Sequence, residues 1–340
     1  MRWGMLQMKD KSMLKKVMGF KEIGVLVPLA VLVIIFSLTS EIFPTANNWL
    51  NITRQISIKG LLGIAMTFVI ITGGIDLSVG SVIAFSSILT ASAMKDYNLP
   101  ILVAVIIGVV IGGITGVVNG ILVAYVNMPA FITTMGTMTI LRGLSYIYTQ
   151  GYPIYDLPKG FREIGQGSIG IIPTSAIILL AVAILASVIL SKTVFGRHIY
   201  AVGGNVEAAK MAGIRVKRVQ LCVYVISGFI SGIAAVVQGA RVGSGLPTIG
   251  NGFEMDAIAA VVIGGAAMSG GSGTILGTLL GSLILGVLDN GLSLLNVDSY
   301  VMNVISGVVV ILAVLIDQIR VVMKKNSQIK ETKAELKIEK

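Results

Sequence analysis

The sequence has few charged residues, one cysteine and one histidine. Charged residues make up 12% of its 340 residues and hydrophobic residues make up 55%, whereas a soluble domain carries about 25% charged residues. A water-soluble fold cannot hide this much apolar surface, because its surface-to-volume ratio forbids it. The composition therefore predicts an integral membrane protein.

The scarcity of cysteine and histidine excludes several kinds of site. The single cysteine, Cys222, excludes an intrachain disulfide, and its position in an apolar run predicts a packing role. Because Cys222 and the single histidine, His198, are far apart in the sequence, they predict neither a metal cluster nor a nucleophilic pair. We expect no catalytic residue and no metal site.

A nucleotide-binding motif is also missing. A P-loop needs a glycine followed by a lysine, because backbone amides and the lysine together hold the phosphates. The sequence contains no Gly-Lys pair. The chain is therefore no P-loop ATPase and needs no cofactor of its own, and if ATP drives it, another subunit binds the ATP.

The net charge of +10 comes from basic residues that gather in three segments. Residues 1–22, residues 192–218 and the tail after Asp317 hold six, six and seven of the 26 Lys and Arg residues. Such clusters are typical of cytoplasmic segments of membrane proteins and not of nucleic-acid binding. They predict that both termini and the 192–218 loop are cytoplasmic. The first apolar run is too long for a signal peptide, so we expect it to be retained.

Ten apolar segments are candidates for membrane-spanning helices, each expected to approach about 20 residues. The sequence thus predicts an all-α membrane domain over residues 23–317, after a basic N-terminus (1–22) and before a charged tail (318–340). The eighth segment is short, which favours a half-helix or a re-entrant segment. The ten are Ile23–Leu38, Ile56–Ile71, Leu77–Met94, Ile101–Tyr125, Ala130–Thr149, Thr174–Leu190, Val219–Ala240, Ala257–Met268, Ile275–Leu295 and Val301–Ile316.

Glycine ladders suggest an internal repeat. Glycines four residues apart form a smooth stripe on one helix face, which lets another backbone approach closely. One ladder lies in the fourth segment and one in the ninth, and each leads into an Asn-Gly pair: Gly108, Gly112, Gly116 and Gly120, then Gly273, Gly277 and Gly281. We expect two five-helix halves that run in opposite directions, as in many transporters.

Polar residues interrupt the apolar segments at three places, and each interruption has two interpretations. The stretch TGGIDLSVGS, residues 72–81, is either a broken helix on a polar path or a cytoplasmic turn in which Asp76 caps the next helix. Arg142 is either functional or extended toward the outer surface. Glu254 and Asp256 are either a helix cap or part of an extracellular mouth.

The 192–218 loop contains a predicted short helix. Asn205 is a good N-cap, residues 206–212 are helix formers, and Gly213 suits the position after the helix end. Such a short helix is marginal alone, so something should pack against it. The loop either rests on lipid headgroups or docks a cytoplasmic partner.

Five segments are distinctive: GGIDLSVGS (73–81), PAFITTMGTM (129–138), GRHIYAVGGNVEAAKMAGI (196–214), DAIAAVVIGGAAMSGGSGTILGTLLG (256–281) and DNGLSLL (289–295). They resemble segments of the permease subunits of bacterial ABC importers for monosaccharides, the ribose permease family. The resemblance implies a dimer of permeases in the inner membrane, a cytoplasmic ATPase pair that binds ATP and Mg²⁺, and an external sugar-binding protein. It leaves the sugar open among ribose, xylose, arabinose, galactose and autoinducer-2.

The resemblance also implies that the predicted short helix couples the permease to the ATPase, through Asn205, Val206, Glu207, Ala208, Ala209, Lys210 and Gly213. A sugar presents hydroxyl groups, so we expect polar side chains along the path, with Asp76, Asn119, Asn127 and Asn290 as candidates. Two other classes are possible. A secondary transporter would need several buried carboxylates, and an intramembrane enzyme would need a convergent catalytic set.

Overall fold

The computed structural model describes residues 23–312 and 314–315, and these residues are mostly helical. The predicted N-terminal segment and charged tail lie outside this range. The helices are accompanied by one antiparallel hairpin with two residues in each strand, β1 (Ser168–Ile169) and β2 (Ile172–Pro173). The helices are α2 (Ile23–Thr39), α3 (Ala46–Ile71), α4 (Val79–Lys95), α5 (Ile101–Ala124), α6 (Ala130–Thr149), α7 (Lys159–Gln166), α8 (Thr174–Lys192), α9 (Val194–Gly204), α10 (Val206–Met211), α11 (Val216–Val242), α12 (Phe253–Ile263) and α13 (Ile275–Leu294), followed by an apolar helix at Ser299–Leu312.

A helix occupies each of the ten predicted apolar segments. Among the described residues, five helices are long and apolar enough to cross a membrane by length and composition: α3, α5, α8, α11 and α13. The predicted short eighth segment is α12, with 11 residues, and it ends where two glycines, Gly264 and Gly265, follow. The number of crossings and the side on which the termini lie stay predictions.

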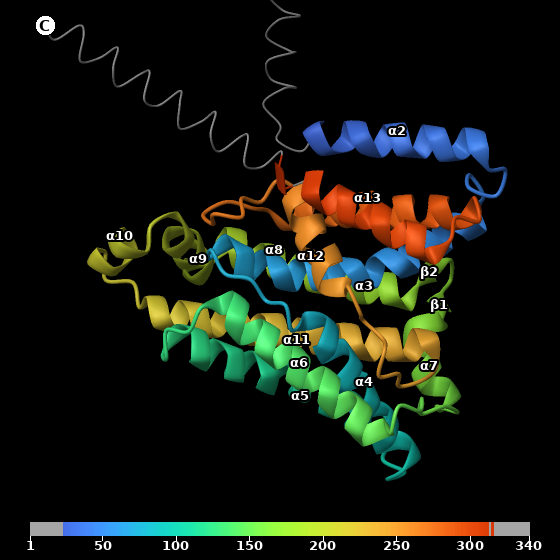
Figure 1. Ribbon diagram of the computed structural model, residues 1–340, viewed down its shortest axis with the longest axis horizontal. Helices are drawn as coiled ribbons and strands as arrows, with labels where there is room; N and C mark the ends of the chain where they lie inside the picture. The colour runs from blue at the N-terminus through green and yellow to red at the C-terminus, as the bar shows by residue number, and fades with distance from the viewer. Residues whose placement is uncertain (1–22, 313, 316–340) are drawn as a thin grey trace, which may run out of the picture.

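The long helices lie roughly side by side along the long axis of the molecule (Figure 1). Helices α9 and α10 project at one end, and α7 and the β hairpin lie at the opposite end. Helix α3 and helix α11 pack against each other at the centre of the bundle. The sequence analysis missed α7, α9 and the hairpin, because it treated the connections that contain them as loops.

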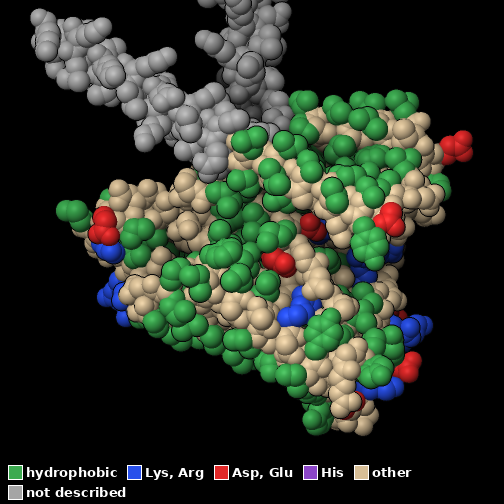
Figure 2. Space-filling view, in the orientation of Figure 1, with side chains coloured by type: hydrophobic (Ala, Val, Ile, Leu, Met, Phe, Trp, Pro, Cys, Tyr) green, Lys and Arg blue, Asp and Glu red, His purple; other side chains and the backbone are tan. Residues whose placement is uncertain are grey.

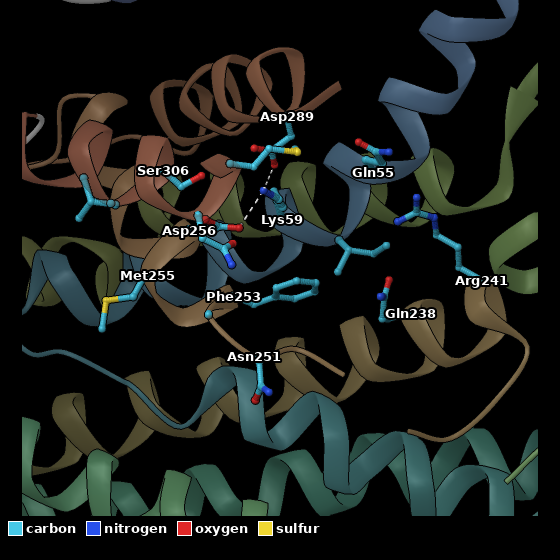
Figure 3. Close-up of a pocket in the computed structure, with 16 residues that line it drawn as sticks. Gln55, Lys59, Gln238, Arg241, Asn251, Phe253, Met255, Asp256, Asp289 and Ser306 are labelled. Atoms are coloured by element: carbon cyan, nitrogen blue, oxygen red, sulfur yellow. Dashed lines mark hydrogen bonds and ion pairs between the residues drawn. The ribbon is translucent and has the colours of Figure 1, made fainter. Parts of the chain in front are cut away.

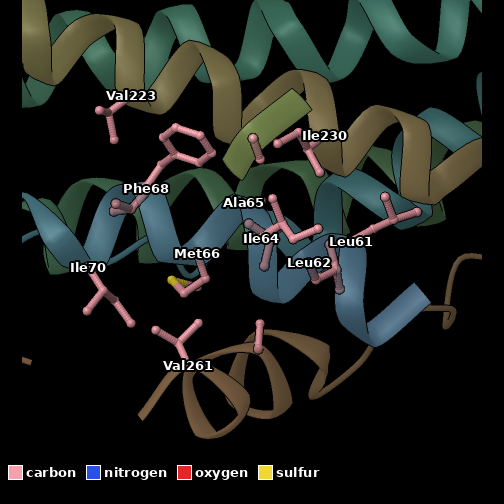
Figure 4. Close-up of a cluster of buried hydrophobic side chains, with 14 of the residues drawn as sticks. Leu61, Leu62, Ile64, Ala65, Met66, Phe68, Ile70, Val223, Ile230 and Val261 are labelled. Atoms are coloured by element: carbon pink, nitrogen blue, oxygen red, sulfur yellow. The ribbon is translucent and has the colours of Figure 1, made fainter. Parts of the chain in front are cut away.

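Helix α3 is the most deeply buried long helix. From Gly60 to Ile71 every residue but Thr67 is apolar, as expected for a helix surrounded by others, and Leu61, Met66 and Phe68 have no exposed surface. Figure 4 shows these side chains between α11 and α12. By contrast, in an 18-residue apolar stretch of each helix, only 22% of the residues of α8 and 33% of those of α5 are buried. The outer faces of α5 and α8 are therefore available to lipid or to a partner.

The helices contact one another in a reciprocal pattern. Helix α11 packs against α5 and α4, while α3 packs against α13 and α12. Helix α4 also packs against α5, and α12 packs against α13. Exchanging α3 with α11, α4 with α12 and α5 with α13 therefore reproduces the same set of contacts.

Glycine contacts bring backbones together at two helix crossings. A Cβ atom on Gly112 of α5 would overlap the carbonyl oxygen of Gly228 of α11 and lie 2.8 Å from the Cα of Gly232. A Cβ on Gly281 of α13 would overlap the carbonyl oxygen of Ala260. The predicted close approaches are confirmed. The two ladders nevertheless face different partners, since the first packs on α11 and the second on α12.

The packing role predicted for Cys222 is wrong. Its side chain is exposed, because α11 turns Val219 and Val223 toward the core instead. Cys222 and His198, far apart in sequence, line one cavity of about 320 Å³ beside the start of α11.

We predict that Gly112→Val strongly destabilises the protein, because the new side chain must separate α5 from α11. Overpacking of this kind costs about 1–3 kcal/mol. The matched control is Gly136→Val in α6, where an added Cβ meets nothing within 4 Å. Thermal unfolding in detergent, followed by size-exclusion chromatography, should show a lower midpoint for Gly112→Val only. Equal midpoints for the two variants would refute the contact.

Candidate functional site

The chain breaks its helical path between α3 and α4. Helix α3 ends at Ile71, and Gly73 has a φ of +78°, a conformation that few other residues adopt. Figure 1 shows this connection returning into the body of the molecule before α4 begins. Asp76 in this segment is only 2% exposed. The segment is therefore a buried interruption and not an exposed turn.

Asp76 holds the interruption to three neighbouring helices. One carboxylate oxygen accepts hydrogen bonds from the backbone N–H of Ser78 at 3.1 Å and from its hydroxyl at 2.6 Å. The other oxygen accepts from the hydroxyl of Ser227 in α11 at 2.8 Å. The side-chain amide of Asn119 in α5 donates to the Ser78 hydroxyl at 2.9 Å and accepts from Thr137 in α6 at 2.7 Å. The result is a continuous buried polar network from α11 to α6.

This network combines features of the two interpretations of Asp76. Ser78 is the N-cap residue of α4 and makes no side-chain capping bond. Asp76 accepts the N–H of that cap residue and also reaches across to α11. It therefore ties the break before α4 to its neighbours in addition to accepting a backbone N–H group near the helix start.

A second interruption lies between α11 and α12. Gly243, Gly250 and Gly252 all have positive φ values in this connection. The Arg142 guanidinium of α6 donates to the carbonyl oxygen of Pro247 at 2.6 Å and to that of Ile249 at 2.9 Å. Arg142 thus satisfies two carbonyl groups in this connection.

The two interruptions meet. A Cβ atom on Gly80, in the first turn of α4, would overlap the carbonyl oxygen of Gly250 and the carboxylate of Glu254. The N-terminal ends of α4 and α12 therefore touch each other. Beside them, Arg142, Tyr146 and Glu254 line a cavity of about 400 Å³.

A larger cavity of about 720 Å³ contains an ion-pair cluster. Lys59 of α3 forms salt bridges with Asp256 of α12, at 2.7 Å, and with Asp289 of α13. All three side chains are mostly buried, with 13–22% of their surface exposed. Figure 2 shows acidic and basic side chains gathered at the middle of an otherwise apolar face, and Figure 3 shows the cluster itself. This cavity offers a polar region between helices of a membrane protein.

Sequence reasoning missed this cluster. Lys59 lies inside the predicted second span, where a lone ionisable residue is itself a signal of function. Asp256 was interpreted only as a cap or part of a mouth. That these charges share one cavity follows from how α3, α12 and α13 pack.

Helices α9 and α10 form a structured element at one end. The Asn205 side chain accepts the N–H of Ala208 at 3.0 Å, and Gly213 has a φ of +80°. The predicted helix boundaries are thereby confirmed to within one residue, since α10 spans Val206–Met211. Met211, which the sequence analysis did not single out, is 91% exposed. Ala209, by contrast, is buried at 3%.

Helix α9 packs against the ends of other helices. A Cβ on Gly203 would overlap the carbonyl oxygen of Ile71 at the end of α3. The hydroxyl of Tyr200 donates to the carbonyl oxygen of Gly273 at 2.7 Å, and burial raises the pKa of this hydroxyl. The hydroxyl therefore stays protonated at neutral pH. Helix α9 is in direct contact with the segments that precede α4 and α13.

Comparison with known proteins identifies the family. The model of the family described as branched-chain amino acid transport system / permease component matches residues 48–314. The chain belongs to this permease family. The ribose import permease protein RbsC of Bacillus subtilis (strain 168) is 46% identical over 300 residues, covering 88% of this chain and 93% of that protein.

Two further relatives have similar coverage. RbsC of Escherichia coli (strain K12) is 42% identical over 299 residues, covering 86% of this permease and 92% of that protein. The D-allose transport system permease protein AlsC of Escherichia coli (strain K12) is 38% identical over 292 residues, covering 86% and 90%. No solved structure matches. This permease is thus a multi-pass protein of the inner membrane.

The four predicted path residues of the permease do not converge on one site. Asp76 and Asn119 share the network described above. Asn290 exchanges two hydrogen bonds of 2.9 Å with Asn48, between α13 and α3. Asn127 is exposed, has a φ of +59° and lines a separate cavity of about 380 Å³ near α10.

We predict that Asp76→Ala lowers the stability of the permease by at least about 2 kcal/mol, because it leaves the Ser78 and Ser227 donors buried without an acceptor. The control is Ser86→Ala in α4, since the buried Ser86 hydroxyl has no partner among the described residues. Thermal midpoints in detergent measure the difference. A midpoint for Asp76→Ala that matches Ser86→Ala would contradict the network's structural role.

Proposed function

We propose that this permease is the membrane-spanning subunit of an ATP-driven importer that carries a monosaccharide, with ribose as the first candidate, into the cytoplasm. The observation that carries the proposal is the 46% identity to a ribose import permease over nearly the whole of both chains. The relatives named for ribose and D-allose are both sugar permeases. The absence of a Gly-Lys pair assigns ATP hydrolysis, with its Mg²⁺, to a separate subunit.

The proposed assembly contains a second copy of the permease, a cytoplasmic ATPase pair and an external sugar-binding protein. The apolar outer faces of α5 and α6 offer contact area for lipid or for the second copy. Helix α10 is the proposed contact with the ATPase. Its support is Met211, a large apolar side chain left 91% exposed at the projecting end of the molecule.

The reciprocal contacts support two inverted halves within ten crossings. In this arrangement α3 corresponds to α11, α4 to α12 and α5 to α13. The breaks before α4 and α12 would then enter the membrane from opposite sides and meet at Gly80 and Gly250. The basic 192–218 segment supports a cytoplasmic position for the end that carries α10.

Coupling would pass from α10 through α9 to the broken helices. ATP binding in the partner pushes on α10, and α9 contacts the end of α3 and the segment before α13. A shift there biases the two halves toward one of two states, so that the path opens alternately to each side. In this scheme Asp76 and Asn119 hold the first break, and Asn127 lines the cytoplasmic exit. Asn290 and its partner Asn48 hold α13 against α3 beside the path.

We predict that Met211→Asp abolishes co-purification of the ATPase from native membranes in mild detergent, because a charge replaces the apolar contact. The matched control is Ile171→Asp, which changes an 83% exposed apolar residue at the opposite end. Mass spectrometry of the purified complex should find a P-loop protein with the wild type and with Ile171→Asp only. Equal recovery of that protein with Met211→Asp would exclude α10 as the docking element.

A further inference from the structure

The cavity around Lys59 has the construction of a ligand site. It combines side chains from α3, α11, α12, α13 and the Ser299–Leu312 helix. Its volume of about 720 Å³ is within the range of small-molecule sites, which are usually preformed, apolar pockets with a few placed polar groups. The polar groups that matter most are Gln55, Lys59, Gln238, Asn251, Asp256 and Asp289.

One of these groups is buried without a partner. Gln238 is only 7% exposed, and its side-chain carbonyl oxygen has no hydrogen-bond partner among the described residues. A buried polar atom of this kind usually has a partner. Because Gln238 lines the cavity (Figure 3), a molecule in the cavity can supply the missing donor.

The charges of the lining balance. Two cationic side chains, Lys59 and Arg241, face two carboxylates, Asp256 and Asp289. Lys59 contacts both carboxylates directly, and Arg241 supplies the second positive charge, so the lining has no net formal charge to attract an ion. The carboxylates still have free lone pairs to accept further donors.

The mixture of donors and acceptors indicates the chemistry of the ligand. Sugar hydroxyls donate and accept at once, so they suit carboxylate and amide oxygens on one side and an ammonium group on the other. Figure 3 shows the ring of Phe253 among Lys59, Asp256 and Gln238, where it offers an apolar surface for the C–H face of a sugar ring. An uncharged, polyhydroxylated molecule matches this lining.

We propose that this cavity is a monosaccharide-binding site within the permease itself, in which Gln238, Asp256 and Asp289 accept hydrogen bonds from sugar hydroxyls and Lys59 donates to them. The proposal rests on the proposed function and adds to it, because it gives the membrane subunit its own contact with the sugar. The external binding protein is then not the only source of selectivity. Arg241, in the last turn of α11, lies near α7, so this end of the cavity lies toward the proposed outer side.

The test is binding of D-ribose to the purified permease in lipid nanodiscs, without partners, by saturation-transfer NMR and titration. The wild type should bind D-ribose and should not bind leucine comparably. Gln238→Leu should weaken D-ribose binding about tenfold. Its thermal midpoint should stay unchanged or rise, because the lost oxygen has no partner in the protein.

The matched control is Gln220→Leu, the same change in the same helix at a different cavity, which should leave D-ribose binding unchanged. Equal weakening by both variants, no weakening by either, or binding of leucine as strong as that of D-ribose would overturn the proposal. Absence of D-ribose binding to a permease that still supports uptake with its partners would overturn this site alone. If the complete wild-type importer, with its partners and ATP, takes up no monosaccharide, the proposed function is overturned as well.

Discussion

The structure depends on satisfying backbone groups that leave helical geometry inside the helix bundle. Backbone groups that are buried there need hydrogen-bond partners, and protein side chains supply several of them. Asp76 accepts donors at the break before α4, and Arg142 donates to carbonyls at the break before α12. Asp76 acts as an acceptor because its break presents a backbone N–H group, and Arg142 acts as a donor because its break presents carbonyl oxygens. Both residues therefore have a structural role, whether or not they also line a transport path.

The consequence of these breaks is a polar region at the centre of an apolar bundle. The starts of α4 and α12 touch at Gly80 and Gly250, and the cavity around Lys59 lies beside α12. The glycine contacts hold α5 against α11 closely enough that their backbones meet. Close packing around interrupted helices is compatible with rigid-body movement of the two proposed halves against each other.

Sequence reasoning predicted the parts of this permease whose signal is local. The ten apolar segments, the caps of α10 at Asn205 and Gly213, and the glycine approaches follow from periodicity, capping chemistry and side-chain size. It did not predict the cluster of Lys59 with two aspartates, because pairing across three helices depends on helix rotation and depth. For the same reason the chosen asparagines do not converge: Asn290 faces Asn48, while Asn119 faces Ser78.

The most direct test of the proposed ATP-driven import is sugar accumulation by the permease in proteoliposomes, reconstituted with its ATPase and supplied with the sugar-loaded binding protein. Labelled ribose should accumulate only when ATP is present on the ATPase side. Ionophores that dissipate ion gradients should leave this accumulation intact. Accumulation driven by an ion gradient, with the permease alone in the membrane and no ATP, would contradict ATP-driven import and favour a secondary transporter.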